Sequence, residues 1–285
     1  RPFIFYLHPW EIDPGQPRVK TGLLSSFRHY NNLGKCESRL RRLLARFGTP
    51  AGILSAGEAE LRATPRIGPG TVAAIRRADI VQAAALLRSL EAEGAAVLTW
   101  EGAGYPPALA ELPDAPPALF VRGALTPADE VAVAIIGTRT PGERSRRAAA
   151  QIAGALAGRG LTVVSGLALG VDRAAHEGAL DAGGRTLAVL GSGIRRLHPR
   201  AHTELAARIA AAGALLSEWH PDAAPSPGRL VARDRIISGL GRWTIVIESG
   251  LTGGSMRTAA FAGKQGRVLA ALPGFKLDQL AKYLS

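Results

Sequence analysis

From residue 131 onward, short apolar runs alternate with longer stretches of helical character. The apolar runs are continuous, which is typical of strands that are buried on both faces of a parallel sheet. They predict strands over Val131–Gly137, Leu161–Ser165, Arg185–Leu190, Ala214–Ser217, Trp243–Glu248 and Arg267–Ala271. Predicted helices span Gly142–Ala157, Gly170–Asp181, Ala201–Ala212 and Gly253–Gly263, with an irregular and helical stretch that reaches Leu240. This alternation predicts an α/β fold with a doubly wound, Rossmann-like parallel sheet.

A different pattern comes before this sheet, because residues 48–95 read as short helices separated by glycine and proline. They predict a small helical domain. Within it, Pro65–Gly70 and the TVAAIRRA segment that follows have the form of a helix–hairpin–helix element. The glycine-rich turn of such an element can offer backbone N–H groups to a DNA phosphate. Packing of two helices around an ordinary turn is the alternative interpretation.

The changes of pattern divide the chain into five parts. We expect an atypical N-terminal segment over residues 1–47, the helical domain over 48–95, a linker or extension over 96–130, the Rossmann-like domain over 131–274 and a C-terminal remnant over 275–285. The linker is inferred from clustered prolines, which suggest a connection that runs over the surface of the next domain.

The charge of the chain points to a polyanionic partner. The formal net charge is +12 over 285 residues, and the sequence pI is about 10.9. Such an excess favours nucleic acid first and a membrane surface second. Biased composition is the alternative source of the charge, because 30 of the 35 basic residues are arginine.

Two features of the composition bear on localisation. No apolar run approaches the roughly 18 residues that a membrane-spanning helix needs. The single cysteine, Cys36, allows no internal disulfide, which fits a reducing compartment. We therefore expect a cytoplasmic protein that does not associate with a membrane.

Glycines, hydroxyl groups and arginines follow several of the predicted strands. Gly137-Thr138-Arg139 ends the first strand, and the following helix would present free N–H groups to an anion there. The comparable segments after later strands are Ser165–Gly170, Gly191–Gly193 with Arg195, Arg196 and Arg200 beyond it, and Ser249–Ser255. Because ligands of such sheets bind at the carboxyl ends of the strands, these segments predict a row of phosphate-binding nests. Neither a P-loop nor a GxGxxG motif is present, so we expect no nucleotide cofactor. His8, Glu11 and Asp13 could form a metal cluster, but a capped turn beside a strand is the favoured interpretation, so we expect no metal.

These segments closely resemble the bacterial DNA-processing protein A (DprA/Smf) family over about residues 40–274. The matching motifs include VAIIGTR (Val133–Arg139), VVSGLALGVDRAAHEGAL (Val163–Leu180), RDRIISGL (Arg233–Leu240) and VIESGLTGGSMRTAAFAGKQGRVLAALPG (Val246–Gly274). The resemblance implies a helical domain of sterile-alpha-motif type before the Rossmann domain. It also implies binding of single-stranded DNA, a homodimer, loading of the recombinase RecA in natural transformation (competence), and no catalytic activity.

The resemblance also assigns candidate residues. The Gly-Ser-Arg turn of the family falls on Gly137-Thr138-Arg139, and its Arg-Asn-Arg motif falls on Arg233-Asp234-Arg235, with Asp in place of Asn. Leu230-Val231 stands where the family usually has Phe-Pro, so an aromatic platform for a base is missing. The expected DNA-binding residues are Gly137, Thr138, Arg139, Ser165, Gly166, Gly170, Arg200, Arg233, Arg235, Gly253, Gly254 and Ser255.

Other interpretations remain open at this point. A nucleotide-processing hydrolase that resembles the cytokinin-activating phosphoribohydrolases is the main alternative, although SGLTGGSMRT (Ser249–Thr258) lacks the glutamate of that signature. His176 follows Asp172 by one helical turn, which allows an acid–base pair or a structural histidine. Residues 1–47 resemble the C-terminal end of exopolysaccharide-linked polysaccharide deacetylases, without the metal-binding barrel that those enzymes need.

Overall fold

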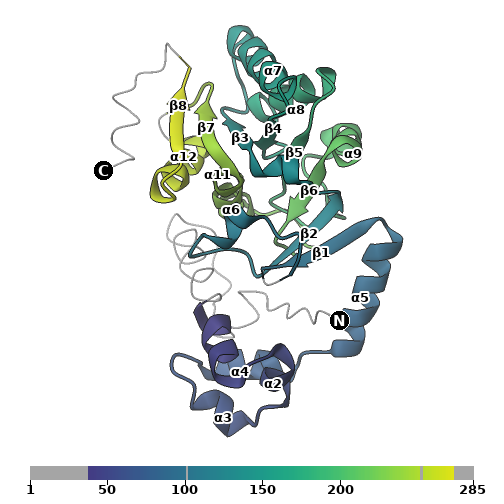
Figure 1. Ribbon diagram of the computed structural model, residues 1–285, viewed down its shortest axis with the longest axis vertical. Coiled ribbons are helices and arrows are strands. Elements are labelled where there is room, and N and C mark those ends of the chain that lie inside the picture. The colour runs from purple at the N-terminus through teal and green to yellow at the C-terminus, as the bar shows by residue number, and fades with distance from the viewer. Residues whose placement is uncertain (1–37, 101, 251–252, 273–285) are drawn as a thin grey trace. The chain divides into compact units, whose positions relative to one another are not determined.

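The computed structural model describes residues 38–100, 102–250 and 253–272 (Figure 1). The predicted deacetylase-like segment lies largely outside these residues, and the C-terminal remnant lies wholly outside them. The contacts divide the chain into two compact units. One comprises Arg1–Glu93 with Pro113–Ala118, and the other comprises Gly94–Leu112 with Leu119–Ser285.

The first unit is helical, with α2 (Pro50–Ser55), α3 (Glu58–Arg62), α4 (Pro69–Arg76) and α5 (Ile80–Ala92). Local capping explains where two of these helices begin. The Thr49 hydroxyl accepts a hydrogen bond from the N–H of Gly52 at 3.0 Å, and the Asp79 carboxylate accepts one from Gln82 at 2.9 Å. The core consists of Leu43, Ile53, Ala56, Leu61, Ile67, Val72 and Ile75.

The second unit contains an eight-stranded sheet in the order β1-β2-β6-β5-β4-β3-β7-β8. Its strands are β1 (Ala95–Thr99), β2 (Ala118–Gly123), β3 (Ala132–Ile136), β4 (Thr162–Ser165), β5 (Thr186–Val189), β6 (Ala214–Ser217), β7 (Gly241–Val246) and β8 (Val268–Ala271). The six neighbouring strands β6, β5, β4, β3, β7 and β8 pair in parallel, and β2 pairs with β6 in antiparallel orientation. The predicted α/β, Rossmann-like fold is therefore confirmed.

The helices of this unit are α6 (Pro107–Ala110), α7 (Glu143–Ala157), α8 (Val171–Asp181), α9 (Thr203–Ala212), α10 (Pro227–Ala232), α11 (Asp234–Leu240) and α12 (Gly254–Lys264), with short 3-10 turns η1 (Pro127–Glu130) and η2 (Arg200–His202). The chain crosses the sheet one way from β3 to β6 and the opposite way from β7 to β8. Because such crossovers are right-handed, the helices cover both faces. No described helix is long and apolar enough to cross a membrane.

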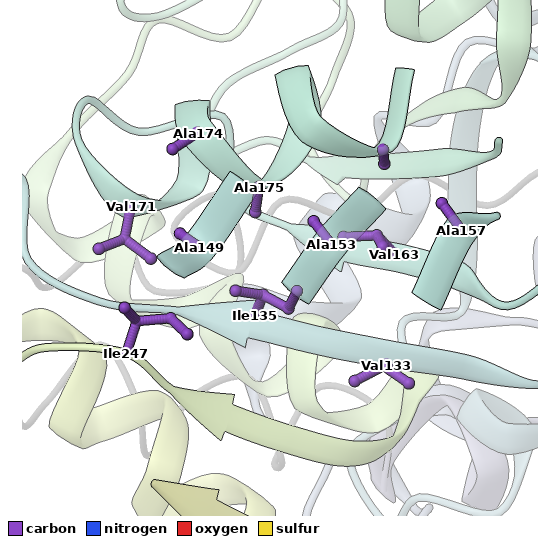
Figure 2. Close-up of a cluster of buried hydrophobic side chains, with 11 residues drawn as sticks. Val133, Ile135, Ala149, Ala153, Ala157, Val163, Val171, Ala174, Ala175 and Ile247 are labelled. Carbon is purple, nitrogen blue, oxygen red and sulfur yellow. The ribbon is translucent and has the colours of Figure 1, made fainter. Parts of the chain in front are cut away.

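Small residues bring α7 and α8 close to the sheet. Ala149, Ala153 and Ala157 on α7 pack with Val163 and other buried side chains of the sheet and α8 (Figure 2). A Cβ atom on Gly178 of α8 would lie 2.2 Å from the carbonyl oxygen of Ala150, so only glycine permits this helix contact. Close packing here fixes the turns that precede both helices.

The stretch 96–130, for which a linker or extension is expected, takes part in the sheet. It supplies most of β1 and all of β2, and β2 continues the sheet beyond β6. None of its prolines lies within either strand. The predicted domain boundaries stay a proposal, with this stretch best regarded as an extension of the sheet.

Candidate nucleic-acid interface

The carboxyl ends of the central strands bring several of the predicted residues to one edge. The strands β4, β3 and β7 are neighbours in the sheet, so the turns that follow them lie side by side. Their exposure differs sharply. Arg139, Arg200 and Gly254 are exposed, Gly137, Thr138, Gly170 and Gly253 are half-buried, and Ser165, Gly166, Arg233, Arg235 and Ser255 are buried.

Backbone contacts fix the turn after β3. The N–H of Thr138 donates to the carbonyl oxygen of Glu248 at 2.7 Å, and the Thr138 hydroxyl accepts from the N–H of Thr140 at 3.3 Å. Glycine is required at 137, because a Cβ atom there would lie 2.5 Å from Cγ2 of Val171. The Thr138 hydroxyl thus helps to shape the turn itself.

Gly170 holds the same turn from the side of α8. Its φ is +81°, and a Cβ atom would lie 2.4 Å from the carbonyl oxygen of Thr138 and 2.6 Å from the carbonyl carbon of Arg139. The N–H of Val171 donates to the carbonyl oxygen of Thr138 at 3.1 Å. The exposed Arg139 side chain therefore extends from a backbone that is held on both sides.

A carboxylate of the chain lies at the helix N-terminus where the sequence predicts an anionic ligand. Gly142 is the N-cap residue of α7, and its N–H donates to Oε2 of Glu248 at 3.1 Å. The positive end of the helix dipole stabilises negative charge at this point. The carboxylate of Glu248 thus provides, from within the chain, the negative charge that a bound phosphate would provide at this helix N-terminus.

The turn after β4 is also satisfied internally. The hydroxyl of Ser165 donates to the carbonyl oxygen of Ile135 at 2.7 Å. The N–H groups of Gly166 and Ala168 both donate to Oδ2 of Asp172, at 3.1 and 3.3 Å. This arrangement is an anion nest, but the Asp172 carboxyl group fills it. Ser165 and Gly166 therefore belong to the scaffold of the edge, and their contact with DNA stays a prediction.

Two histidines clamp the backbone of the same turn at Leu167, whose φ of +57° is uncommon for a large side chain. The N–H of Leu167 donates to Nε2 of His176 at 3.3 Å, and its carbonyl oxygen lies 2.9 Å from Nδ1 of His202. Nδ1 of His176 lies 2.7 Å from the Thr186 hydroxyl. Burial lowers the pKa of His176 to about 3, so the ring is neutral and structural rather than one half of an acid–base pair.

The two arginines of the Arg233-Asp234-Arg235 motif are buried, with exposed fractions of 5% and 3%. The guanidinium of Arg235 pairs with both oxygens of the Glu218 carboxylate, at 3.1 and 2.6 Å. Nε of Arg233 donates to the carbonyl oxygen of Leu230 at 3.1 Å. Acceptors of the same chain surround both guanidinium groups, which does not favour direct contact with DNA, and the assignment of Arg233 and Arg235 to DNA binding stays a prediction.

Asp234 lies buried between charges. Its Oδ1 is 3.3 Å from Nε of Arg233, so the aspartate pairs with this arginine. Burial raises the pKa of Asp234 to about 7, and the nearby Asp172 raises it as well, while Arg233 opposes the shift. Burial also raises the pKa of Asp172, again opposed chiefly by Arg233. A buried group of two carboxyls and one guanidinium thus lies directly beneath the candidate edge.

The start of α12 remains in part a candidate phosphate-binding site, as the sequence predicts. Ser255 is buried, and its hydroxyl donates to the hydroxyl of Ser249 at 2.6 Å. Gly253 is the N-cap residue in an extended conformation, and Gly254 has open space around it. Backbone N–H groups at a helix start attract anions, so Gly253 and Gly254 stay candidates for a phosphate contact.

Arg257 is an exposed cation of this edge that the sequence interpretation missed. It lies one helical turn beyond Gly253 in α12, and that spacing was the available signal. Arg200 opens η2 and is also exposed, whereas Arg195 pairs with Asp222 at 3.0 Å. No group of three His, Cys, Asp or Glu side chains is placed to hold a metal ion among the described residues.

Comparison with known proteins agrees with these motifs. The sequence model of the family described as DNA recombination-mediator protein A matches residues 96–282, which is more than half of the chain. A second model, described as a domain of unknown function, matches residues 1–49 and is compatible with the deacetylase-like segment.

Curated relatives come from several bacteria. The chain is 43% identical over 171 residues to Protein Smf of Escherichia coli, which covers 60% of this chain and 46% of that protein. It is 38% identical over 177 residues to DNA processing protein DprA of Streptococcus pneumoniae, which covers 62% of each. The chain therefore spans about half to three fifths of the length of these relatives.

Two solved structures share the fold. The DprA structure from Streptococcus pneumoniae superposes with a TM-score of 0.73 and 29% identity, covering 86% of this chain and 85% of the other. The DprA structure from Helicobacter pylori, whose description concerns a single-stranded DNA binding mode, has a TM-score of 0.60 and 31% identity, covering 66% of this chain and 87% of the other.

Proposed function

The chain belongs to the DNA recombination-mediator protein A family, and on this basis we propose that it binds single-stranded DNA along the carboxyl edge of its sheet. The observation that carries the proposal is Arg139, an exposed guanidinium on a turn that Gly137, Thr138 and Gly170 hold rigidly. A guanidinium can bind a phosphate through two parallel hydrogen bonds. A rigid support reduces the conformational entropy that is lost on binding.

We divide the predicted DNA-binding residues into two groups. In the proposal, Arg139, Arg200, Gly253 and Gly254 meet phosphates, and Arg257 joins them as a further exposed cation. The supporting group comprises Gly137, Thr138, Ser165, Gly166, Gly170, Arg233, Arg235 and Ser255, whose contacts within the chain hold the edge in shape. Cations spread over several loops suit an extended polyanion better than a single nucleotide.

The wider role follows the family and is part of the same proposal. We infer that the chain protects incoming or recombining single strands, acts as a homodimer and loads the RecA recombinase during natural transformation. We assign no catalytic step to it. The phosphoribohydrolase alternative is not favoured, because the curated relatives and the two solved structures described above are DprA and Smf proteins.

A comparison of ligand length tests the proposal. Binding of labelled oligo-dT of about 30 nucleotides, of dTMP and of AMP is measured in parallel, together with release of free adenine from AMP. We expect tight binding of the oligonucleotide, weak binding of both mononucleotides and no adenine. Binding of AMP that matches or exceeds binding of the oligonucleotide, accompanied by adenine release, would overturn the proposal in favour of the hydrolase.

A further inference from the structure

A buried, unbalanced charge cluster lies beneath the proposed DNA-binding edge. Its members are Asp172, Arg233 and Asp234, with exposed fractions of 6%, 5% and 7%. Nε of Arg233 lies 3.3 Å from Oδ1 of Asp234, and the guanidinium also acts electrostatically on Asp172. Two ionised carboxylates around one guanidinium leave a net charge of −1 in a site with little access to water.

An uncompensated negative charge is unfavourable in a buried site. Either one of the two carboxyl groups binds a proton, or cations outside the cluster compensate the charge. Asp172 accepts two hydrogen bonds from the backbone N–H groups of Gly166 and Ala168, and such bonds stabilise its charged form. Among the described residues, the carboxylate of Asp234 forms an ion pair with Arg233. The two carboxyls titrate as a coupled pair, and this geometry favours Asp234 as the residue that holds the proton.

Two exposed cations supply the charge outside the cluster. The backbone of Arg139 packs against Gly170, two residues before Asp172, where a Cβ atom would lie 2.6 Å from its carbonyl carbon, and Arg257 lies exposed on α12. The positive charges of both arginines favour the ionised form of Asp234. They are also the side chains that the proposed function offers to phosphates. A bound phosphate would neutralise them, which removes their support for the buried negative charge.

We propose that binding of a DNA phosphate at Arg139 and Arg257 drives proton uptake by the Asp172–Asp234 pair, so that DNA binds more tightly as pH falls. This inference rests on the proposed function and adds regulation of DNA binding by pH. Linkage requires the reciprocal effect, because a proton that binds the pair frees both arginines for phosphate. The chain would therefore release DNA more readily on the alkaline side of neutrality.

Other charged groups around Asp234 do not supply this linkage. Arg235, on the same helix, is neutralised by Glu218 through a bidentate pair. His176 stays neutral, because burial lowers its pKa to about 3. His198, two residues before Arg200, is exposed, and its replacement by glutamine serves as a control.

The test measures binding of oligo-dT to the full chain between about pH 6.5 and about pH 8.5 at constant ionic strength. We expect several-fold tighter binding at the lower pH for the parent and for two controls, Asp222→Asn and His198→Gln. Asp222 pairs with Arg195 and lies outside the cluster. Asp234→Asn removes one carboxylate at constant shape, so its affinity should be nearly independent of pH.

Calorimetry of the parent adds a measurement that needs no variant. Titrations in two buffers of different ionisation enthalpy should reveal net proton uptake on binding. Zero uptake, or a pH dependence that persists in Asp234→Asn or disappears in His198→Gln, would overturn the inference and leave DNA binding itself established. If no chain bound oligo-dT at any pH, the proposed function would fail together with the inference.

Discussion

At the scale of single residues, the carboxyl edge depends on backbone positions that admit no side chain. Gly170 combines a φ of +81° with a close approach to the turn that carries Arg139. Gly183 also has a positive φ, +69°, but a Cβ atom there would meet nothing within 4 Å. Gly170 also has a ψ of −118°, outside the left-handed helical region, so both its backbone and the close approach disfavour a side chain there.

We predict that Gly183→Ala lowers the free energy of unfolding by about 1 kcal/mol, which is the usual cost of a left-handed residue. Gly170→Ala should cost clearly more, because its Cβ atom would also collide with backbone that cannot move alone. Urea unfolding of both variants measures the difference. Equal losses for the two variants would show that the close approach at Gly170 is not needed.

Arg235 and Glu218 show how packing changes the interpretation of a basic residue. They stand 17 residues apart along the chain, and their pairing depends on how α11 packs near the end of β6. An arginine in a basic chain suggests DNA contact until that packing is known. Burial turns the same side chain into a structural one.

Breaking this pair should damage the fold. Arg235→Met leaves the Glu218 carboxylate buried without its main partner, so we expect a loss of about 3–5 kcal/mol in the free energy of unfolding. Arg235→Met combined with Glu218→Leu should recover most of the loss and bind oligo-dT as the parent does. If the stable double variant lost DNA binding, Arg235 would contact DNA after all.

At the scale of elements, the strand pattern predicts the sheet well. The strand expected at Ala214–Ser217 is observed with the same bounds, since buried parallel strands are continuous apolar runs. The strand pattern does not reveal which backbone N–H groups are already bound by side chains of the same chain. Asp172 and Glu248 occupy the backbone N–H groups that the glycine pattern suggested for phosphates. Glycine-rich turns predict an anion, but the pattern does not say whether the chain supplies it.

Glu248 allows a direct test at this scale. Glu248→Gln keeps an oxygen that can accept from the N–H of Gly142 but removes a negative charge beside the turn of Arg139. We predict about two- to five-fold tighter binding of oligo-dT at low salt, with an effect that shrinks as salt rises.

Fluorescence anisotropy of a labelled oligonucleotide measures this change. Glu177→Gln is the matched control, because Glu177 pairs with Arg173 on α8 and has no role at the edge. Unchanged affinity for Glu248→Gln would mean that phosphates do not approach the N-terminus of α7.

At the scale of the whole molecule, the buried cluster links stability to pH. The pKa of Asp234 is about 7 in the folded chain and near 3.8, the ordinary value, in the unfolded chain. The folded state therefore binds the proton more tightly, so this residue lowers stability as pH rises from about 3.8 to about 7. Above that window its effect is constant.

Asp234→Asn should consequently raise the free energy of unfolding, most of all above pH 7, with a gain that shrinks as pH falls toward 4. Urea unfolding of the parent and the variant across this range measures the gain. A gain that is independent of pH would show that Asp234 holds no unusual proton.

The family and the fold could be predicted from sequence because ordered motifs and strand periodicity are local properties. The DNA-binding surface could be predicted only in part. Arg139 was found because it directly follows a strand, while the exposed Arg257 was missed and the burial of Arg233 was not foreseen. Exposure is decided by packing between distant segments, which no local pattern records.

The central claim is that Arg139 binds a phosphate of single-stranded DNA. It is tested most directly by the salt dependence of oligo-dT binding for the parent and for Arg139→Ala. We predict weaker binding by the variant and a log–log salt slope that is shallower by about one unit, since one phosphate contact is lost. An unchanged affinity and an unchanged slope in a folded variant would contradict the account.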